Sequence, residues 1–149
     1  MICTRGGGRM GADDIIERLG LAPHPEGGWY RQTWIAQEIP RPSGTCIYFL
    51  LKSGERSHWH RVDATEIWHF YAGTPLTLSM AETERGPAAQ SVLGPELSLG
   101  QTPQVIVPAD HWQSAEAGEG WALVGCTVSP GFTFDGFELA APDFDIPAA

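Results

Sequence analysis

Two histidines and a glutamate stand close together in residues 57–73, which read SHWHRVDATEIWHFYAG. His58 and His60 are separated by a single residue, and Glu66 follows six residues after His60. Imidazole takes up and releases protons near neutral pH, and imidazole together with carboxylate also binds transition metals. The segment therefore predicts an acid–base site or a metal site, and the structural alternative is a core strand that contains histidine.

Strand geometry decides which of these side chains can meet. Side chains alternate between the two faces of a β-strand, so His58 and His60 share a face if residues 57–62 form one strand. In the following strand, the face that carries the carboxylate consists of Glu66, Trp68 and Phe70. A short turn between the two strands would place His58, His60 and Glu66 around one point. We expect that point to be a small-molecule cavity, because such sites combine apolar walls with a few convergent polar groups.

The elements that must position these residues are short and punctuated by glycine and proline. Ten segments rich in β-branched and aromatic residues predict strands: 28–35, 45–51, 57–62, 66–73, 76–82, 90–94, 104–108, 111–117, 120–128 and 131–139. One short helix is predicted in DDIIERLGL, where Asp14 and Glu17 have the spacing of a capping box and Gly20 is a stop signal. The pattern predicts an all-β sandwich or barrel with one short N-terminal helix.

The composition limits the partners and the compartment. The chain has 149 residues and a formal net charge of -9, with nine lysines and arginines in total, so nucleic acid and anionic membrane surfaces are not expected partners. Cys3, Cys46 and Cys126 lack metal or redox spacing, which indicates a reduced, cytoplasmic protein. We expect residues 1–12 to be a flexible tail and residues 13–149 to be a single domain.

Four segments carry a resemblance to a known family: LGLAPHPEGGWYRQTW, SHWHRVDATEIWHFYAG, VPADHWQ and ALVGCTVSPGFTFDGFEL. Together they resemble the small single-domain cupins of unassigned function, over most of the chain from residue 19 to residue 144. The resemblance implies a double-stranded jelly-roll β-barrel, usually a homodimer, related in shape to the dTDP-sugar epimerases. It implies no particular reaction.

The resemblance also implies a metal set, which this sequence matches in part. The second cupin motif reads P-x-G-x-x-H, and here Asp110 stands at the glycine position and Gln113 at the histidine position. Glutamine is a poorer ligand than imidazole for transition metals, although His111 shares the Gln113 face and could compensate. A divalent Fe, Mn, Ni or Zn ion would then be held by His58, His60, Glu66 and Gln113 or His111.

Further residues are candidates for contact with a ligand. Glu26 and Arg31 are expected at the mouth of the pocket, where arginine would suit a carboxylate or phosphate, and the alternative is a structural ion pair between them. The remaining candidates for ligand contact are Gln113, Trp68, Phe70 and His111.

Three classes of function remain open for a small polar ligand, such as a sugar derivative. The first is an epimerase or isomerase, in which His58 or His60 is the base and Glu66 supports it. The second is a metal-dependent cupin enzyme, and the third is a binding module that performs no chemistry. Outward-facing aromatic residues, such as Trp59 and Tyr71, need cover on a small barrel and predict a homodimer.

Overall fold

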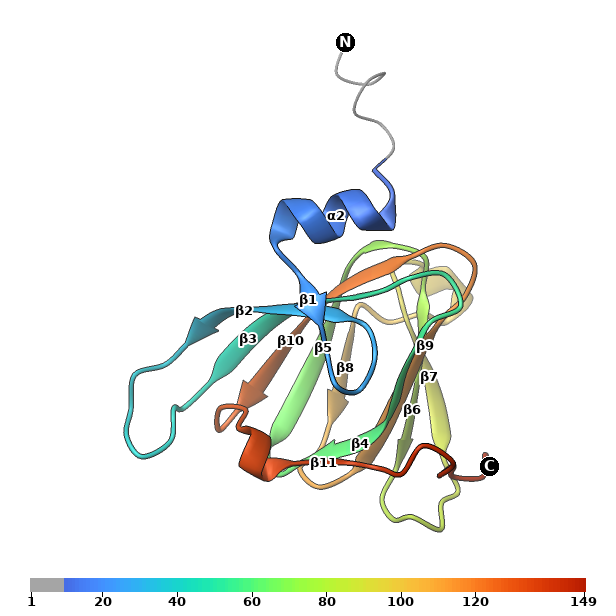
Figure 1. The fold of residues 1–149 in the computed structure, drawn as a ribbon. Helices are drawn as coiled ribbons and strands as arrows, with labels where there is room; N and C mark the ends of the chain where they lie inside the picture. The colour runs from blue at the N-terminus through green and yellow to red at the C-terminus, as the bar shows by residue number, and fades with distance from the viewer. Residues whose placement is uncertain (1–9) are drawn as a thin grey trace.

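The computed structural model describes residues 10–149, so most of the predicted tail at residues 1–12 lies outside the described residues (Figure 1). These residues are mostly β, with one α-helix and two separate antiparallel sheets. The elements are α2 (Ala12–Leu19), β1 (Ala22–Pro23), β2 (Trp29–Ile35), β3 (Thr45–Leu51), β4 (Arg56–Val62), β5 (Thr65–Gly73), β6 (Leu76–Ala81), β7 (Ala89–Leu93), η1 (Leu97–Leu99), β8 (Gln104–Val107), β9 (Trp112–Ala117), β10 (Ala122–Ser129), η2 (Phe134–Gly136) and β11 (Phe137–Leu139).

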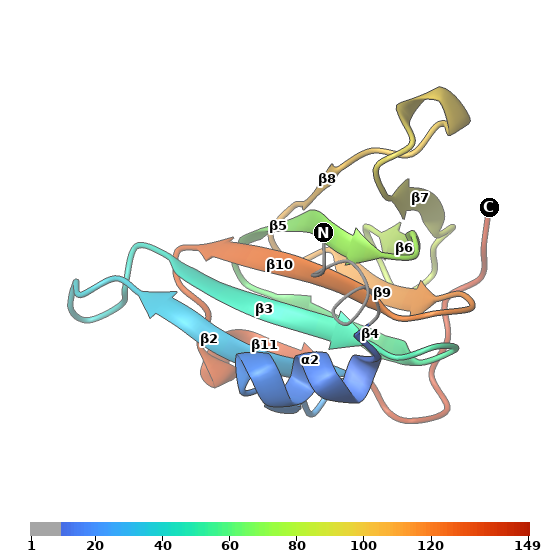
Figure 2. The same cartoon turned by 90° about the horizontal axis from the view of Figure 1, so that it is seen from above.

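The two sheets face each other across the core. The larger sheet has the order β1-β2-β3-β10-β5-β8, and the smaller has the order β11-β4-β9-β6-β7. Their inner faces meet in a cluster of buried apolar side chains, in which the rings of Phe49 and Trp68 pack edge to face with centroids 5.7 Å apart. The hairpin of β2 and β3 extends beyond the body of the molecule in both views (Figures 1 and 2).

Nine of the ten predicted strands are present, with ends that differ from the prediction by at most two residues. The prediction of a strand at residues 131–139 is wrong for most of its length. Thr133 caps a 3-10 turn by accepting a hydrogen bond from the backbone N–H of Gly136 at 3.1 Å, and the strand β11 begins only at Phe137. Phe132, Phe134 and Phe137 therefore pack together as a cluster, and Phe132 and Phe134 do not alternate along a strand.

The predicted helix is α2, and it ends at Gly20 in the left-handed conformation, with φ of 67°. The interpretation of Asp14 as its cap is wrong, because Asp14 lies inside the first turn and accepts a hydrogen bond from the N–H of Gly11 at 3.0 Å. Ile15 on the buried side packs with Leu50 of β3, so the helix covers part of the outer face of the larger sheet (Figure 2). Between residues 10 and 149, no helix is long and apolar enough to cross a membrane.

The C-terminal segment covers the outer face of the smaller sheet. Trp59 is 2% exposed, packs with Ile146, and donates a hydrogen bond from Nε1 to Asp145 Oδ1 at 2.8 Å. The expectation that Trp59 would need cover from a second subunit is therefore wrong, because the chain supplies that cover itself. Tyr71, by contrast, is 50% exposed on the outer face of the larger sheet.

Candidate functional site

A cavity of about 200 Å³ lies between the two sheets, beside the apolar core. Strands of both sheets, the loop before β2 and the segment after β10 supply its walls. The lining residues are His24, Glu26, Tyr30, Gln32, Thr45, Ile47, Phe49, His60, Val62, Glu66, Trp68, Cys126, Val128, Phe132 and Phe134. Its walls are mainly aromatic and aliphatic, and two carboxyl groups and two imidazoles interrupt them, which is the composition expected of a small-molecule site.

The loop between β1 and β2 carries two of these groups, His24 and Glu26, into the cavity. Two glycines follow them with left-handed backbones, φ of 106° at Gly27 and 80° at Gly28. A side chain at Gly27 would collide with the carbonyl oxygen of Arg56, because an added Cβ would lie 2.4 Å from it. The glycines therefore allow the loop to pack closely against β4, and Glu26 is buried, at 8% exposure. The sequence predicts Glu26 at the mouth of the pocket, but it lies deeper than that.

Gly27 gives the first testable prediction. We expect Gly27→Ala to lower the free energy of unfolding by at least about 1–2 kcal/mol, because a left-handed backbone costs that much for a residue with a Cβ, and the collision with Arg56 adds to it. Urea denaturation of both proteins measures the change. The matched control is Gly118→Ala, where an added Cβ meets no atom of residues 10–149 within 4 Å. Equal stability of the two variants would contradict this account of the loop.

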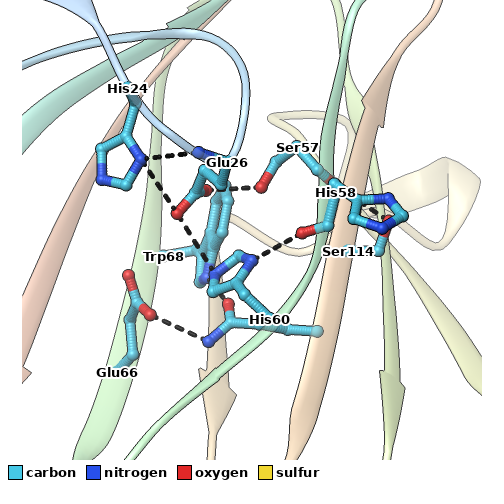
Figure 3. A network of polar contacts seen from close by, with 9 residues as sticks. His24, Glu26, Ser57, His58, His60, Glu66, Trp68 and Ser114 are labelled. Atoms are coloured by element: carbon cyan, nitrogen blue, oxygen red, sulfur yellow. Dashed lines mark hydrogen bonds and ion pairs between the residues drawn. The ribbon is translucent and has the colours of Figure 1, made fainter. Parts of the chain in front are cut away.

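The Glu26 carboxyl lies between two imidazole rings (Figure 3). Its Oε1 atom is 3.4 Å from Nδ1 of His24 and 3.4 Å from Nε2 of His60. Its Oε2 atom is in a short hydrogen bond with the hydroxyl of Ser57 on β4. One carboxyl oxygen therefore faces two ring nitrogens inside a buried pocket.

The hydrogen bonds around the rings determine where the protons are. Nδ1 of His60 lies 2.7 Å from the carbonyl oxygen of His58, and a carbonyl only accepts, so Nδ1 carries a proton and Nε2 of the neutral ring is a lone pair. The backbone N–H of Glu26 donates to Nδ1 of His24 at 3.2 Å, so that nitrogen is also a lone pair. An ionised Glu26 would face two unprotonated ring nitrogens, whereas a protonated Glu26 can donate to Nε2 of His60, whose lone pair is free.

Electrostatics favour the same protonation state. Burial raises the pKa of the Glu26 carboxyl to about 8. Burial, with a smaller contribution from His60, lowers the pKa of His24 to about 4, and burial also lowers the pKa of His60. At neutral pH the group is therefore a neutral carboxylic acid between two neutral imidazoles, and its two close contacts are not ion pairs.

Glu66 on β5 brings a second carboxyl to the cavity. Its Oε1 accepts a hydrogen bond from Nε2 of Gln113 at 2.9 Å, and Oε1 of Gln113 accepts one from Nε1 of Trp68 at 2.8 Å. Burial raises the pKa of Glu66 to about 7, while the nearby His60 opposes that rise. Glu66 can therefore change its charge near neutral pH, and the alternation that places Glu66, Trp68 and Phe70 on one face is confirmed.

The prediction that His58 lies in the cavity with His60 is wrong. The pairing of β4 with β9 shifts between Ser57 and His60, three positions apart. Both side chains therefore face inward, where His60 lines the cavity and Ser57 contacts Glu26. His58 turns to the other side, where its Nε2 lies 2.8 Å from the carbonyl oxygen of Ala141 (Figure 3). The bulge adds one residue to the strand, and regular alternation does not anticipate it.

Other predicted ligand contacts lie outside the cavity wall. Arg31 is exposed and donates from Nη1 to the carbonyl oxygen of Leu19 at 3.2 Å, so neither the expected contact with an anionic ligand nor an ion pair with Glu26 is formed. Phe70 packs against the apolar core, and His111 does not line the cavity. Gln113 is buried behind Glu66 and reaches the cavity through that carboxyl.

The side chains present do not fit the metal set that the sequence implies. No group of three or more His, Cys, Asp and Glu residues within 10–149 is arranged to hold a metal ion. His58 faces away from the cavity, and the amide of Gln113 is engaged at both ends by Glu66 and Trp68. The four named ligands therefore do not converge on one point.

Sequence reasoning missed several residues of the site. His24 and Cys126 line the cavity, and Ser57 holds Glu26. His24 stands two residues before Glu26, and Glu26 directly precedes the glycine pair. That spacing was a usable signal, because it predicts one tight loop that carries both side chains. No such signal exists for Cys126, because the pairing of β10 with β5 that sets it opposite Trp68 is not encoded locally.

Comparisons with known proteins place the chain in a family. Residues 13–140 match the family described as "Cupin superfamily (DUF985)". A protein from Shewanella oneidensis of solved structure is 42% identical, with a TM-score of 0.83, covering 89% of this chain and 86% of that one. A hypothetical protein from Leishmania major is 29% identical, with a TM-score of 0.80, covering 89% of this chain and 88% of that one. No curated protein matches this chain.

A more distant likeness shows the fold alone. Oxalate decarboxylase from Bacillus subtilis is 17% identical and has a TM-score of 0.62, with 78% of this chain and 29% of that chain covered. The architecture is therefore that of the cupin fold, whereas a likeness at this identity carries no information about reaction or ligands.

Proposed function

This chain belongs to the cupin superfamily (DUF985), and from that premise we propose that its cavity binds a small molecule and moves protons on it, as an epimerase or isomerase does. The resemblance that the four sequence segments indicate is thus confirmed at the level of the family. We also infer that the two sheets form the jelly roll typical of cupins, with the cavity between its two halves.

The observation that supports the proposed reaction is the position of the Glu26 carboxyl between His24 and His60. General acid–base catalysis works best when the pKa of the catalytic group lies near the operating pH, and burial brings Glu26 to about 8. The carboxyl has an acceptor for its proton 3.4 Å away, at Nε2 of His60. The pair can therefore hold one proton in two places.

The proton can be followed through such a reaction. Transfer from Glu26 to Nε2 of His60 leaves a carboxylate beside an imidazolium. The carboxylate then accepts a proton from a carbon next to a carbonyl group of the substrate, which becomes an enolate. Return of a proton to a different atom of that enolate gives the isomer, and the pair is restored. No atom is lost and no oxidant is needed.

The proposal is tested in two steps. A library of small carbonyl compounds is first screened by thermal shift, because a ligand that binds the native state raises the melting temperature. Each compound that binds is then incubated with the protein in deuterated buffer, and incorporation of deuterium next to the carbonyl is followed by NMR. Exchange that depends on the protein supports the proposal. Saturable binding without exchange would contradict the proposed reaction and would favour a binding module that performs no chemistry, the third class predicted from the sequence.

His58 provides a prediction that separates the two histidines of the first motif. We expect His58→Ala to retain deuterium exchange and to lower the free energy of unfolding by no more than about 1 kcal/mol, because it loses one solvent-accessible contact to Ala141. His60→Ala should abolish exchange, because Glu26 loses its proton acceptor. Loss of exchange in His58→Ala with the fold intact would contradict the assignment.

A homodimer remains part of the proposal. Exposed apolar side chains gather on the extended hairpin and on the outer face of the larger sheet: Trp34, Ile35, Ile39, Tyr71 and Ile106. Contiguous exposed apolar surface usually marks a contact with another protein. This arrangement supports a second copy of the chain as the partner, with the larger sheet as the interface.

The dimer can be checked by light scattering at micromolar concentration. We expect the mass of two chains for the native protein and of one chain for the variant Ile106→Lys, because a buried charge at an interface has no partner there. Leu99→Lys is the matched control, since Leu99 is 73% exposed on the turn η1. A monomer mass for the native protein would contradict the prediction.

A further inference from the structure

Within residues 10–149, the walls of the cavity carry two carboxyl groups and no lysine or arginine. Of the arginines and lysines within residues 10–149, none lines it. Several of these cations are committed elsewhere: Arg31 to the carbonyl oxygen of Leu19, Arg41 to Asp63 at 2.7 Å, and Arg61 to Glu138 at 2.8 Å. A ligand that carries a phosphate or a carboxylate would therefore meet no fixed positive charge inside.

The walls around the carboxyl groups are rich in aromatic rings: Tyr30, Phe49, Trp68, Phe132 and Phe134. The faces of aromatic rings attract cations, and the attraction strengthens when the pair is shielded from water. Carboxyl groups enclosed by aromatic rings are a combination that suits an organic ammonium group. The chain as a whole is acidic as well, with a formal net charge of -9, which favours the approach of cations over that of anions.

We propose that the ligand of this cavity is a small protonated amine, and that the Glu66 carboxylate is its counterion. This inference names the ligand class of the site described above and so rests on the proposed function. The cavity volume of about 200 Å³ limits the ligand to a molecule smaller than a typical drug.

Hydrogen bonding distinguishes Glu66 from Glu26 as the counterion. The oxygens of Glu26 are engaged by His24, His60 and Ser57. Glu66 accepts one strong hydrogen bond, from Gln113, and its further partner is the thiol of Cys126, which is a weak donor. Figure 3 shows the Glu66 carboxyl pointing into the space shared with His24 and Glu26. Glu66 is therefore free to bind an ammonium group while Glu26 keeps its own contacts.

Protonation also favours a cation over an anion as ligand. An anion would need an imidazolium as its partner, but the pKa of His24 is about 4, and the two ring nitrogens of His60 already face His58 and Glu26. A cation needs only the ionised form of Glu66, whose pKa of about 7 makes that form abundant at neutral pH. Binding of an amine should therefore release a proton from the protein.

Three probes of matched size and different charge test the ligand class. Benzylamine is a cation at pH 7.5, benzyl alcohol is neutral, and benzoate is an anion. Affinities are measured by isothermal titration calorimetry on the full chain, with thermal shift as a second readout. We expect benzylamine to bind most tightly, benzyl alcohol more weakly and benzoate least. Benzoate binding as tightly as benzylamine, or no binding by benzylamine, would overturn the inference.

Two further measurements assign the counterion. In the native protein, the affinity for benzylamine should rise between pH 6 and pH 8, because Glu66 becomes ionised over that range. Glu66→Gln should lower the affinity for benzylamine by about tenfold or more, because a charge-assisted hydrogen bond is lost. The affinity for benzyl alcohol should not change. Glu119→Gln, on an exposed loop, is the control. If the Glu66 variant does not fold, a flat pH profile in the native protein still overturns the assignment.

The two proposals fail in different ways. Preferential binding of benzylamine with no deuterium exchange on any compound would refute the proton-transfer reaction and leave the ligand class intact. Exchange on neutral carbonyl compounds, with no preference for benzylamine over benzyl alcohol, would refute the ligand class and leave the reaction intact.

Discussion

Deuterium exchange catalysed by the native protein should fall by about 10²–10⁴-fold in the variant Glu26→Gln, since general acid–base catalysis typically supplies that factor. Glutamine has nearly the shape of the protonated acid, and its amide can still donate toward His24 or His60. It cannot give up or accept a proton in this range of pH. The variant should therefore fold normally and bind the same ligands, while exchange is lost.

Comparison with a second variant makes this result specific. Exchange rates are measured by NMR for the native protein, Glu26→Gln and the control Glu119→Gln at the same ligand saturation. Ligand affinity is measured in parallel, because loss of binding would mimic loss of catalysis. If Glu26→Gln kept the native exchange rate at saturation, Glu26 would not be the proton donor, and the contacts with His24 and His60 would be structural only.

The strands were predictable because their signal is local. Alternating apolar residues between glycine and proline signals define β3, β5 and most other strands, and they also place Glu66 and Trp68 on one face. The helix stop at Gly20 was equally visible, because a left-handed residue there favours glycine. The family resemblance added how these strands are assembled.

The site was predictable only in part because two of its features depend on contacts between distant segments. The bulge in β4 shifts the alternation between Ser57 and His60, and it arises from pairing with β9, about fifty positions later in the chain. The approach of Glu26 to His60 depends on how the glycine loop docks on β4. Neither the bulge nor the docking of the loop is visible in composition or periodicity. The sequence therefore predicts His58 inside the cavity and gives no prediction for His24.

The metal prediction has the same origin. A motif of two histidines implies two ligands only if the strand is regular, and the bulge removes His58 from the set. Gln113, at the position where cupins usually have histidine, instead links Glu66 with Trp68. Gln113 and the bulge in β4 thus weaken the predicted metal set for two independent reasons.

The protonation state of Glu26 has a large expected effect on stability as well. Glu26 has a pKa of about 8 in the folded protein and an ordinary value of 4.5 when exposed. Between these values the folded chain keeps a proton that the unfolded chain has lost, so the contribution of Glu26 to stability falls as the pH rises. It is complete below about pH 4.5 and lost above about pH 8.

Glutamine at position 26 does not titrate, so the difference between the two proteins isolates this group. The free energy of unfolding of Glu26→Gln, relative to the native protein, should increase by on the order of a few kcal/mol from pH 5 to pH 8 and then level off. His24, with its pKa lowered to about 4, loses stability as the pH falls from 6.5, but it is present in both proteins and largely cancels. Urea denaturation at a series of pH values provides the measurement.

The opposite sign would identify a different resting state. If Glu26 were ionised and paired with a protonated His60, removing its charge would leave a buried imidazolium without a partner, and Glu26→Gln would be the less stable protein at pH 7 to 8. The ring geometry argues against that state, because Nδ1 of His24 accepts the N–H of Glu26 and so has no proton to donate to the same carboxyl. A variant that gains stability with pH while losing proton exchange would show that the buried acid is kept for its proton, at a cost in stability that glutamine avoids.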